Sequence, residues 1–125
     1  FFDLILIVCN KKMKNKFLKN LKKKFYWHNI FFTQSGYNRQ ESSKKGVLFL
    51  KKFNPKKILI HDAARPLIDN HLVKKIINKL DNYNVCTPYI THQDYIKYKN
   101  KKFNINNKNP KFIQTPQGFL YKNIF

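Results

Sequence analysis

The sequence lacks any apolar run that could cross a membrane, and it contains few cysteines. Its longest uninterrupted apolar stretch, Leu4–Cys9, is far shorter than the roughly 20 residues that a transmembrane helix needs. We therefore expect no membrane partner and no targeting segment. Cys9 and Cys86 lack the spacing of a metal site. We expect them to be small apolar residues on strands in a reducing compartment, not a disulfide.

Acidic residues are also scarce, and this leaves a strongly basic chain. Six Asp and Glu stand against 26 Lys and Arg, which gives a formal net charge of +20. Such a balance is typical of nucleic-acid-binding proteins, and a basic nucleic-acid-binding module is one alternative. However, only Arg39 and Arg65 are arginines, and a phosphate-binding groove favours arginine for its bidentate contacts. The lysines are spread along the whole chain, so we favour compositional drift and expect no nucleic-acid partner.

The hydrophobic residues predict one α/β domain. They make up 42% of 125 residues, enough for a single core. Continuous aliphatic runs alternate with segments of helical periodicity, and this alternation indicates a mostly parallel sheet with helices on both faces. A hairpin-like excursion follows at residues 94–113. The expected strands lie at residues 4–8, 30–33, 57–61, 84–90 and 112–113, and the expected helices at residues 11–26, 39–52 and about 70–80.

Three polar loops follow the expected strands: Ser35–Ser42, His61–Pro66 and Gln114–Gly118. Ligands of open α/β sheets bind beyond the carboxyl ends of the strands, so we expect the three loops to converge on one site. The only glycines, Gly36, Gly46 and Gly118, lie in or beside these loops, as do both arginines.

The second loop carries the clearest chemistry. Asp62 and Arg65 lie three residues apart, separated by two alanines that leave the backbone open to a ligand. A carboxylate there suits Mg²⁺, which binds substrate phosphates, and the guanidinium supplies donors to phosphate oxygens. The alternative is an ion pair that only fixes the loop. We interpret His61 as a packing residue at the end of a strand.

The other two loops have ordinary structural alternatives. Ser35–Ser42 opens a helix with backbone N–H groups that could bind an anion or read a base edge. Taken alone, it is better interpreted as a capped turn. Gln114–Gly118 could present a hydroxyl to a substrate, but taken alone it is better interpreted as a corner between a strand and a helix.

Together the segments resemble the 2-C-methyl-D-erythritol 4-phosphate cytidylyltransferase family. Ile58–Pro66 is similar to that family's most diagnostic segment, and Thr115–Gln117 is similar to its later Thr-Pro-Gln segment. The similarity covers essentially the whole chain and implies a Rossmann-like nucleotidyltransferase fold with a short β-arm at about residues 91–110. The supporting matches are Gly36, Arg39, Ser42 and Gly46 in a turn and helix, Asp94 and Lys97 in a strand, and Phe119.

This resemblance implies an enzyme that joins CTP to 2-C-methyl-D-erythritol 4-phosphate in the non-mevalonate isoprenoid pathway, releasing pyrophosphate. It implies Mg²⁺ as the cofactor, a homodimer as the assembly, and the cytoplasm or a plastid as the location. Asp62 and Arg65 would be catalytic, with Asp62 as the metal ligand. The implied nucleotide-binding residues are Gly36, Ser42 and Ala63, and the implied substrate-binding residues are Asp62, Arg65, Thr115 and Lys108.

Several departures from the family leave a second alternative, a non-catalytic or decayed relative. The family's glycine-rich loop would precede this chain, and a substrate-binding lysine would follow it. We therefore interpret residues 1–125 as a partial nucleotidyltransferase domain that is inactive alone. Tyr37 and Tyr95 replace family residues, and Asn107, with Lys108 beside it, stands where a partner subunit lends an arginine.

Overall fold

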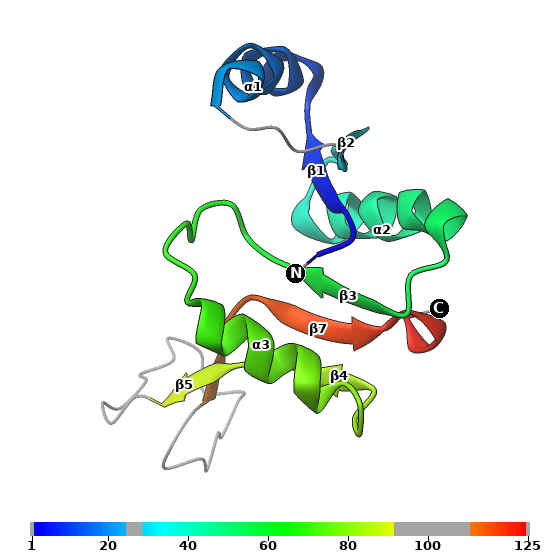
Figure 1. Ribbon diagram of the computed structural model, residues 1–125, viewed down its shortest axis with the longest axis vertical. Coiled ribbons are helices and arrows are strands. Elements are labelled where there is room, and N and C mark those ends of the chain that lie inside the picture. The colour runs from blue at the N-terminus through cyan, green and yellow to red at the C-terminus, as the bar shows by residue number, and fades with distance from the viewer. Residues whose placement is uncertain (1, 25–28, 92–110, 125) are drawn as a thin grey trace, which may run out of the picture. The chain divides into compact units, whose positions relative to one another are not determined.

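The computed structural model describes residues 2–24, 29–91 and 111–124, apart from the side chains of residues 21–24. The chain forms two compact units, Phe1–Pro55 and Lys56–Phe125, and each is described here by itself. Both combine strands with helices (Figure 1). Among the described residues, no helix is both long and apolar enough to span a membrane.

The first unit is a parallel strand pair with two helices. Strand β1 (Ile5–Cys9) pairs along its whole length with β2 (Ile30–Gln34). Helix α1 (Lys11–Lys24) follows β1 directly, and the Asn10 side chain accepts the Met13 N–H at 2.9 Å. Helix α2 (Arg39–Leu50) follows β2 and continues as a 3₁₀ turn, η1 (Lys51–Phe53). The expected elements of this half therefore form, with small shifts at their ends.

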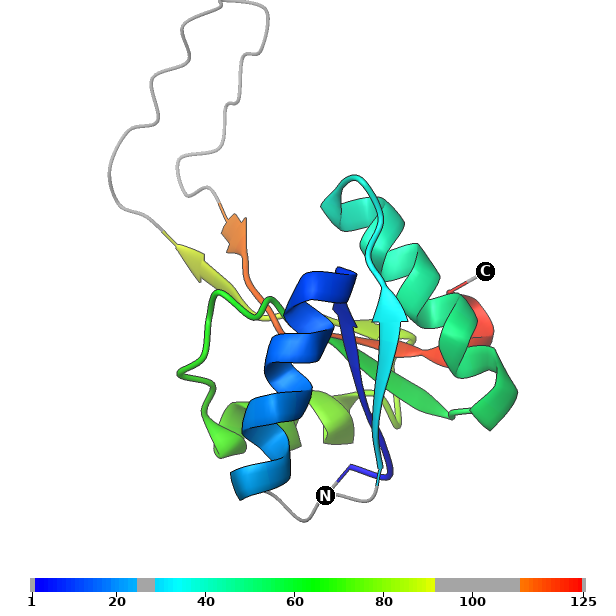
Figure 2. The ribbon, with the colours of Figure 1, turned by 90° about the horizontal axis from the view of Figure 1, so that it is seen from above.

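Helices α1 and α2 lie on opposite faces of the β1–β2 pair (Figure 2). Successive residues of a strand point to opposite faces. The Phe31 ring lies 6.2 Å from that of Phe49 in α2, whereas Lys14 of α1 places its Nζ 6.0 Å from the Phe32 ring. Gly46 lets α2 approach β1 closely, since a Cβ there would lie 3.0 Å from Val8 Cγ2. The predicted arrangement of helices on both faces is confirmed in this unit.

The second unit is a three-stranded sheet with one helix. Strands β3 (Lys57–Ile60) and β4 (Val85–Cys86) both pair antiparallel with β7 (Gln117–Leu120), which lies between them. A 3₁₀ turn, η2 (Tyr121–Asn123), follows β7. Helix α3 (Asn70–Lys79) is capped by Asp69, whose side chain accepts the His71 N–H at 3.0 Å. The core residues of this unit are Ile58, Val73, Ile76, Leu80 and Pro116.

The α/β class is confirmed, but the sheet is less parallel than predicted. In the part of the chain that the structure describes, β1–β2 is parallel and the other three strand pairs are antiparallel. The sequence predicted a corner leading into a helix at Gln114–Gly118, and this was wrong because a strand, β7, follows the corner. Gly118 disguised that strand, since glycine is depleted in strands.

The predicted strand at residues 84–90 is divided in two. Pro88 has no N–H for a sheet ladder, so β4 ends at Cys86 and β5 (Tyr89–Thr91) starts a new pair with β6 (Lys111–Ile113). Phe112 and Ile113 thus form a separate two-stranded ribbon and do not return to the main sheet. The predicted β-arm lies outside the described residues, except for Thr91. Cys9 and Cys86 are free cysteines on strands, as predicted.

Gly118 is required because β7 and α3 approach each other closely. A Cβ at this position would lie 2.6 Å from Ile76 Cγ2 and 3.0 Å from Leu80 Cδ1. We predict that Gly118→Ala lowers the free energy of unfolding by about 1–3 kcal/mol, measured by urea denaturation. In Gly118→Ala/Ile76→Ala the clash with Cγ2 is absent, so the combined loss should be smaller than the sum of the single losses. An unchanged midpoint for Gly118→Ala would contradict the close approach.

Lys52 lies over an aromatic cluster on the α2 side of the first unit. Its Nζ lies 4.0, 5.0 and 5.8 Å from the ring centroids of Phe49, Phe53 and Phe31. We predict that Lys52→Met, which keeps an apolar stem but loses the charge, costs about 0.5–1 kcal/mol of stability in urea. Lys52→Arg should retain most of this energy, and Lys51→Met is the neighbouring control. Equal stability of Lys52→Met and the parent would show that the cation–π contacts contribute nothing.

Candidate active site

The Asp62 loop leaves the sheet at the carboxyl end of β3 and forms a tight turn. The Arg65 N–H donates to the Asp62 carbonyl at 2.9 Å, which leaves Ala63 and Ala64 exposed at the tip. The loop then runs to Asp69 without helical structure, as Pro66 predicts. Asp62 and Arg65 therefore stand at the two ends of one short turn.

Thr115 lies beside this turn, although it is 53 residues from Asp62 in sequence. Its Oγ1 accepts the Asp62 N–H at 3.3 Å and lies 3.1 Å from His61 Nδ1. The next residue, Pro116, is almost completely buried and precedes β7, so the corner is anchored in the core. The predicted convergence of the His61–Pro66 and Gln114–Gly118 loops is confirmed.

The interpretation of His61 as a packing residue was wrong. Its side chain is exposed and has hydrogen-bond partners at both ring nitrogens. Nε2 lies 2.8 Å from the Arg65 carbonyl oxygen, and Nδ1 lies beside the Thr115 hydroxyl. Because these partners are distant in sequence or belong to the backbone, spacing alone gave no signal of this role.

The Asp62–Arg65 ion pair is too loose to account by itself for the conformation of the loop. Arg65 Nε lies 4.0 Å from Asp62 Oδ2, and the two side chains are 48% and 31% exposed. Exposed pairs of this kind contribute little to stability. Backbone and Thr115 hydrogen bonds contribute to holding the loop, and both charged side chains are partly exposed.

The Ser35–Ser42 turn belongs to the first unit and is capped by its own side chains. The Gly36 N–H donates to Ser42 Oγ at 3.0 Å, and the Tyr37 N–H donates to Glu41 Oε2 at 2.9 Å. Asn38 accepts the Glu41 N–H at 2.8 Å as the N-cap of α2. These N–H groups are therefore occupied, and the capped-turn interpretation is confirmed. The approach of this turn to the Asp62 loop stays a prediction.

Glu41 organises that turn, and sequence reasoning missed it. The N–H of Tyr37, followed by the nearby ammonium of Lys45 at 3.3 Å, holds the pKa of the Glu41 carboxyl below its usual value. Gly36 is needed next to it, since a Cβ there would lie 2.5 Å from Glu41 Cβ. The spacing of Glu41 and Lys45, four residues apart on a helix, was the available signal. Tyr37 itself is fully exposed.

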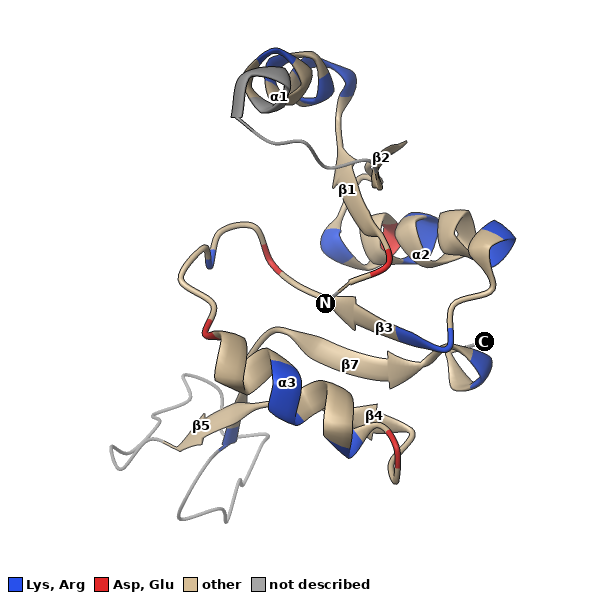
Figure 3. Ribbon diagram, viewed as in Figure 1, with Lys and Arg blue, Asp and Glu red and all other residues tan. Residues whose placement is uncertain are grey.

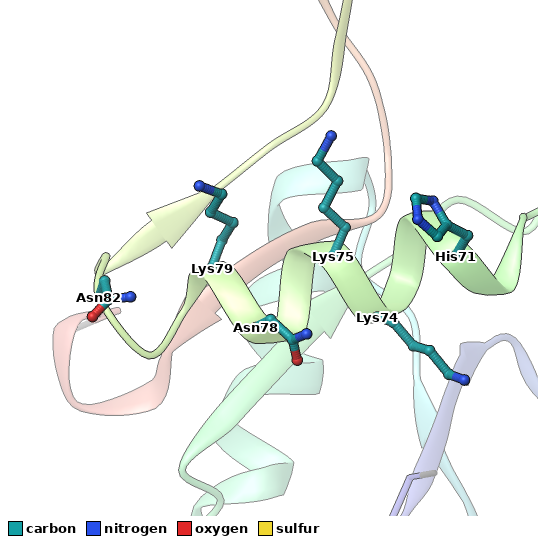
Figure 4. Close-up of a pocket in the computed structure, with 6 residues that line it drawn as sticks. All are labelled: His71, Lys74, Lys75, Asn78, Lys79 and Asn82. Carbon is teal, nitrogen blue, oxygen red and sulfur yellow. The ribbon is translucent and has the colours of Figure 1, made fainter.

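Three residues named in the sequence analysis cannot be placed relative to the Asp62 loop. Lys108, Asp94 and Lys97 fall outside the described residues. Lys and Arg occur on α1 and α2 of the first unit and on α3 of the second (Figure 3), so in the described part of the chain they are not confined to one element. Helix α3 borders a hollow that contains none of the predicted site residues (Figure 4). That hollow is lined by His71, Lys74, Lys75, Asn78, Lys79 and Asn82.

Comparison with known proteins agrees with the motifs. Residues 2–125 match the family model described as IspD, 2-C-methyl-D-erythritol 4-phosphate cytidylyltransferase. The bifunctional enzyme IspD/IspF of Pelagibacter ubique is 39% identical over 126 residues, covering 99% of this chain and 33% of the relative. The 2-C-methyl-D-erythritol 4-phosphate cytidylyltransferase of Clostridium tetani is 36% identical over 94 residues, covering 72% of this chain and 37% of the relative.

Solved structures give the same result. The 4-diphosphocytidyl-2C-methyl-D-erythritol synthase of Anaerococcus prevotii superimposes with a TM-score of 0.81 at 26% identity, covering 97% of this chain and 56% of that protein. The bifunctional IspDF of Campylobacter jejuni gives a TM-score of 0.72 at 26% identity, covering 97% of this chain and 29% of that protein. The chain spans about a third of the length of the Pelagibacter ubique relative. Because the family model matches nearly every residue, the chain belongs to the 2-C-methyl-D-erythritol 4-phosphate cytidylyltransferase family.

Proposed function

We propose that the protein transfers the cytidylyl group of CTP to 2-C-methyl-D-erythritol 4-phosphate in isoprenoid biosynthesis. A phosphate oxygen of the methylerythritol phosphate attacks the α-phosphorus of CTP. The bond from that phosphorus to the bridging oxygen breaks, and pyrophosphate leaves with the electron pair. The product contains a new diphosphate linkage, and no covalent enzyme intermediate is required.

The observation that carries this proposal is the meeting of Asp62, Arg65 and Thr115 in a chain of this family. Phosphoryl-type transfer needs accessible charged groups that are held in a fixed place. Asp62 and Arg65 are accessible, while the hydrogen bonds of their loop fix the backbone that carries them. The arrangement therefore suits positioning and charge neutralisation.

Each residue of this cluster has a distinct proposed role. Arg65 offers planar, permanently charged donors to the phosphate oxygens of the methylerythritol substrate. Asp62 holds a divalent cation and approaches the same substrate. Thr115 contacts the substrate from the neighbouring corner, and Lys108 would contribute a further positive charge to it.

The Asp62 carboxylate suits a Mg²⁺ ion that is also bound by the phosphates of the substrate. No group of three or more potential ligand side chains occurs in the described part of the chain, so a cage made of protein alone is not the pattern here. Mg²⁺ characteristically uses one or two carboxylates together with substrate phosphates. When bound, it supplies neutralisation of phosphate charge. Asp62, with an accessible carboxylate, would hold it.

The nucleotide is proposed to contact Gly36, Ser42 and Ala63. The Ser42 hydroxyl donates to the Asn38 carbonyl at 2.8 Å and accepts the Gly36 N–H, so its first contribution is to shape the turn around Gly36. Ala63 stands exposed at the tip of the Asp62 loop, where its backbone is open to a ligand. Gly36 and Ser42 would help to read cytosine and ribose, and Ala63 would contribute backbone contacts to the nucleotide.

We further propose a homodimer that uses the β5–β6 ribbon. Isolated two-stranded ribbons are marginally stable in water. Ile90 and Ile113 of this ribbon are 50% and 54% exposed, and Tyr89 and Phe112 are exposed as well. A second copy of the chain would cover these apolar side chains. The expected location is the cytoplasm, with a plastid as the alternative.

The test measures pyrophosphate release from CTP and methylerythritol phosphate with Mg²⁺, on the protein as its gene encodes it. Asp62→Asn and Arg65→Lys should each lower kcat/KM roughly a hundredfold or more, since the first removes a charge and the second removes the planar fork of donors. Asp81→Asn, which changes a carboxylate paired with Lys57, is the matched control and should retain parent activity.

Two results would contradict the proposal. Absence of pyrophosphate release by the parent protein, with CTP still bound, would indicate the decayed relative. Activity of Asp62→Asn within a fewfold of the parent would show that the reacting groups lie elsewhere.

A further inference from the structure

His61 lies at the centre of a hydrogen-bond chain that ties together the three parts of the proposed site. Its ring contacts the Arg65 carbonyl through Nε2 at 2.8 Å and Thr115 Oγ1 through Nδ1 at 3.1 Å. The same Thr115 oxygen accepts the Asp62 N–H at 3.3 Å. Two side chains take part in these hydrogen bonds, those of His61 and Thr115. Of the two, only Thr115 is among the substrate-binding residues implied by the family resemblance.

The chemistry of the partners fixes the direction of this chain. A carbonyl oxygen can only accept, so Nε2 must carry the hydrogen and donate to Arg65. In the neutral imidazole Nδ1 is then an acceptor, and the Thr115 hydroxyl must donate to it. Hydrogen bonds therefore run from the Asp62 N–H through Thr115 and His61 to the Arg65 carbonyl, and each donor is used once.

This direction decides what Thr115 can still do. A hydroxyl has one donor and two acceptor lone pairs. The donor is directed to His61, and one lone pair receives the Asp62 N–H. One lone pair remains, so Thr115 can accept a hydrogen bond from a substrate but cannot donate one. Phosphate oxygens at neutral pH offer mainly acceptors, whereas polyol hydroxyls offer donors.

We propose that His61 is a positioning residue that makes Thr115 an acceptor for a hydroxyl group of the polyol substrate. This inference rests on the proposed function. His61 also fixes the Arg65 backbone, because the ring bond to the Arg65 carbonyl joins the turn bond from the Arg65 N–H to Asp62. His61 does not touch the reacting atoms and acts through Thr115 and Arg65.

The first test is spectroscopic and uses this chain with ¹⁵N-labelled histidine. At mildly alkaline pH, NMR should show His61 as the Nε2–H tautomer, with Nδ1 as a hydrogen-bond acceptor. In Thr115→Val the Nδ1 resonance should move toward the value of an unbonded nitrogen, because the donor is gone. His71, which lies in α3, serves as the internal control and should not shift. An Nδ1–H tautomer for His61 would overturn the inference.

The second test is kinetic and uses the protein as its gene encodes it. His61→Ala should raise KM for methylerythritol phosphate roughly tenfold, the effect of one misplaced hydrogen-bonding group, with a smaller change in kcat and in CTP affinity. His61→Asn keeps an acceptor near the Nδ1 position and should recover most of the loss. His61→Gln reaches the Nε2 position but offers Thr115 no acceptor there, so it should recover less.

The outcomes separate this inference from the proposed function. An inactive parent protein would refute the function, while the tautomer measurement would still decide the hydrogen-bond chain. An active parent with unchanged KM in His61→Ala, or with equal recovery by Asn and Gln, would refute the positioning role alone. If His61→Ala fails to fold, the positioning role is decided by two other results. These are the difference in KM between His61→Asn and His61→Gln, and the tautomer of His61 observed by NMR.

Discussion

The hydroxyl group of Thr115 is the constraint on which the proposed site depends. It accepts the Asp62 N–H and lies 3.1 Å from His61 Nδ1, and both of these residues precede Thr115 by more than fifty positions. Besides this bridge, within the Asp62–Arg65 loop there are also the turn bond, the contact of His61 Nε2 with the Arg65 carbonyl, and a 4.0 Å ion pair between partly exposed groups. Such a pair is too weak to place a carboxylate and a guanidinium for phosphate chemistry.

The fold provides this bridge through an antiparallel strand. β7 runs between β3 and β4, so its beginning lies at the end of β3, where the Asp62 loop starts. Gln117 pairs with Ile60, and the preceding Pro116 is buried in the core. Gly118 allows α3 to close over the same strand. Packing in the second unit thus determines where Thr115 presents its hydroxyl.

Sequence reasoning succeeded where local chemistry determined the structure. The capped turn at Ser35–Ser42 and the loop enforced by Pro66 follow from residues close in sequence, and the parallel β1–β2 pair follows from the alternation of strands and helices. It failed where the structure of a segment depends on a residue that is distant in sequence. β7 was missed because Gly118 is explained by Ile76 and Leu80, which lie about forty residues earlier. His61 was misinterpreted for the same reason, since its partner Thr115 lies 54 residues away.

The most direct measurement of the central claim is amide hydrogen exchange at Asp62, followed by NMR on this chain. The Asp62 N–H has the Thr115 hydroxyl as its acceptor, so the account predicts a protected amide in the parent chain. Protection should fall markedly in Thr115→Val and persist in Thr115→Ser, while the amide of Phe119 in β7 exchanges equally in all three proteins. Unchanged protection of Asp62 in Thr115→Val would contradict the bridge.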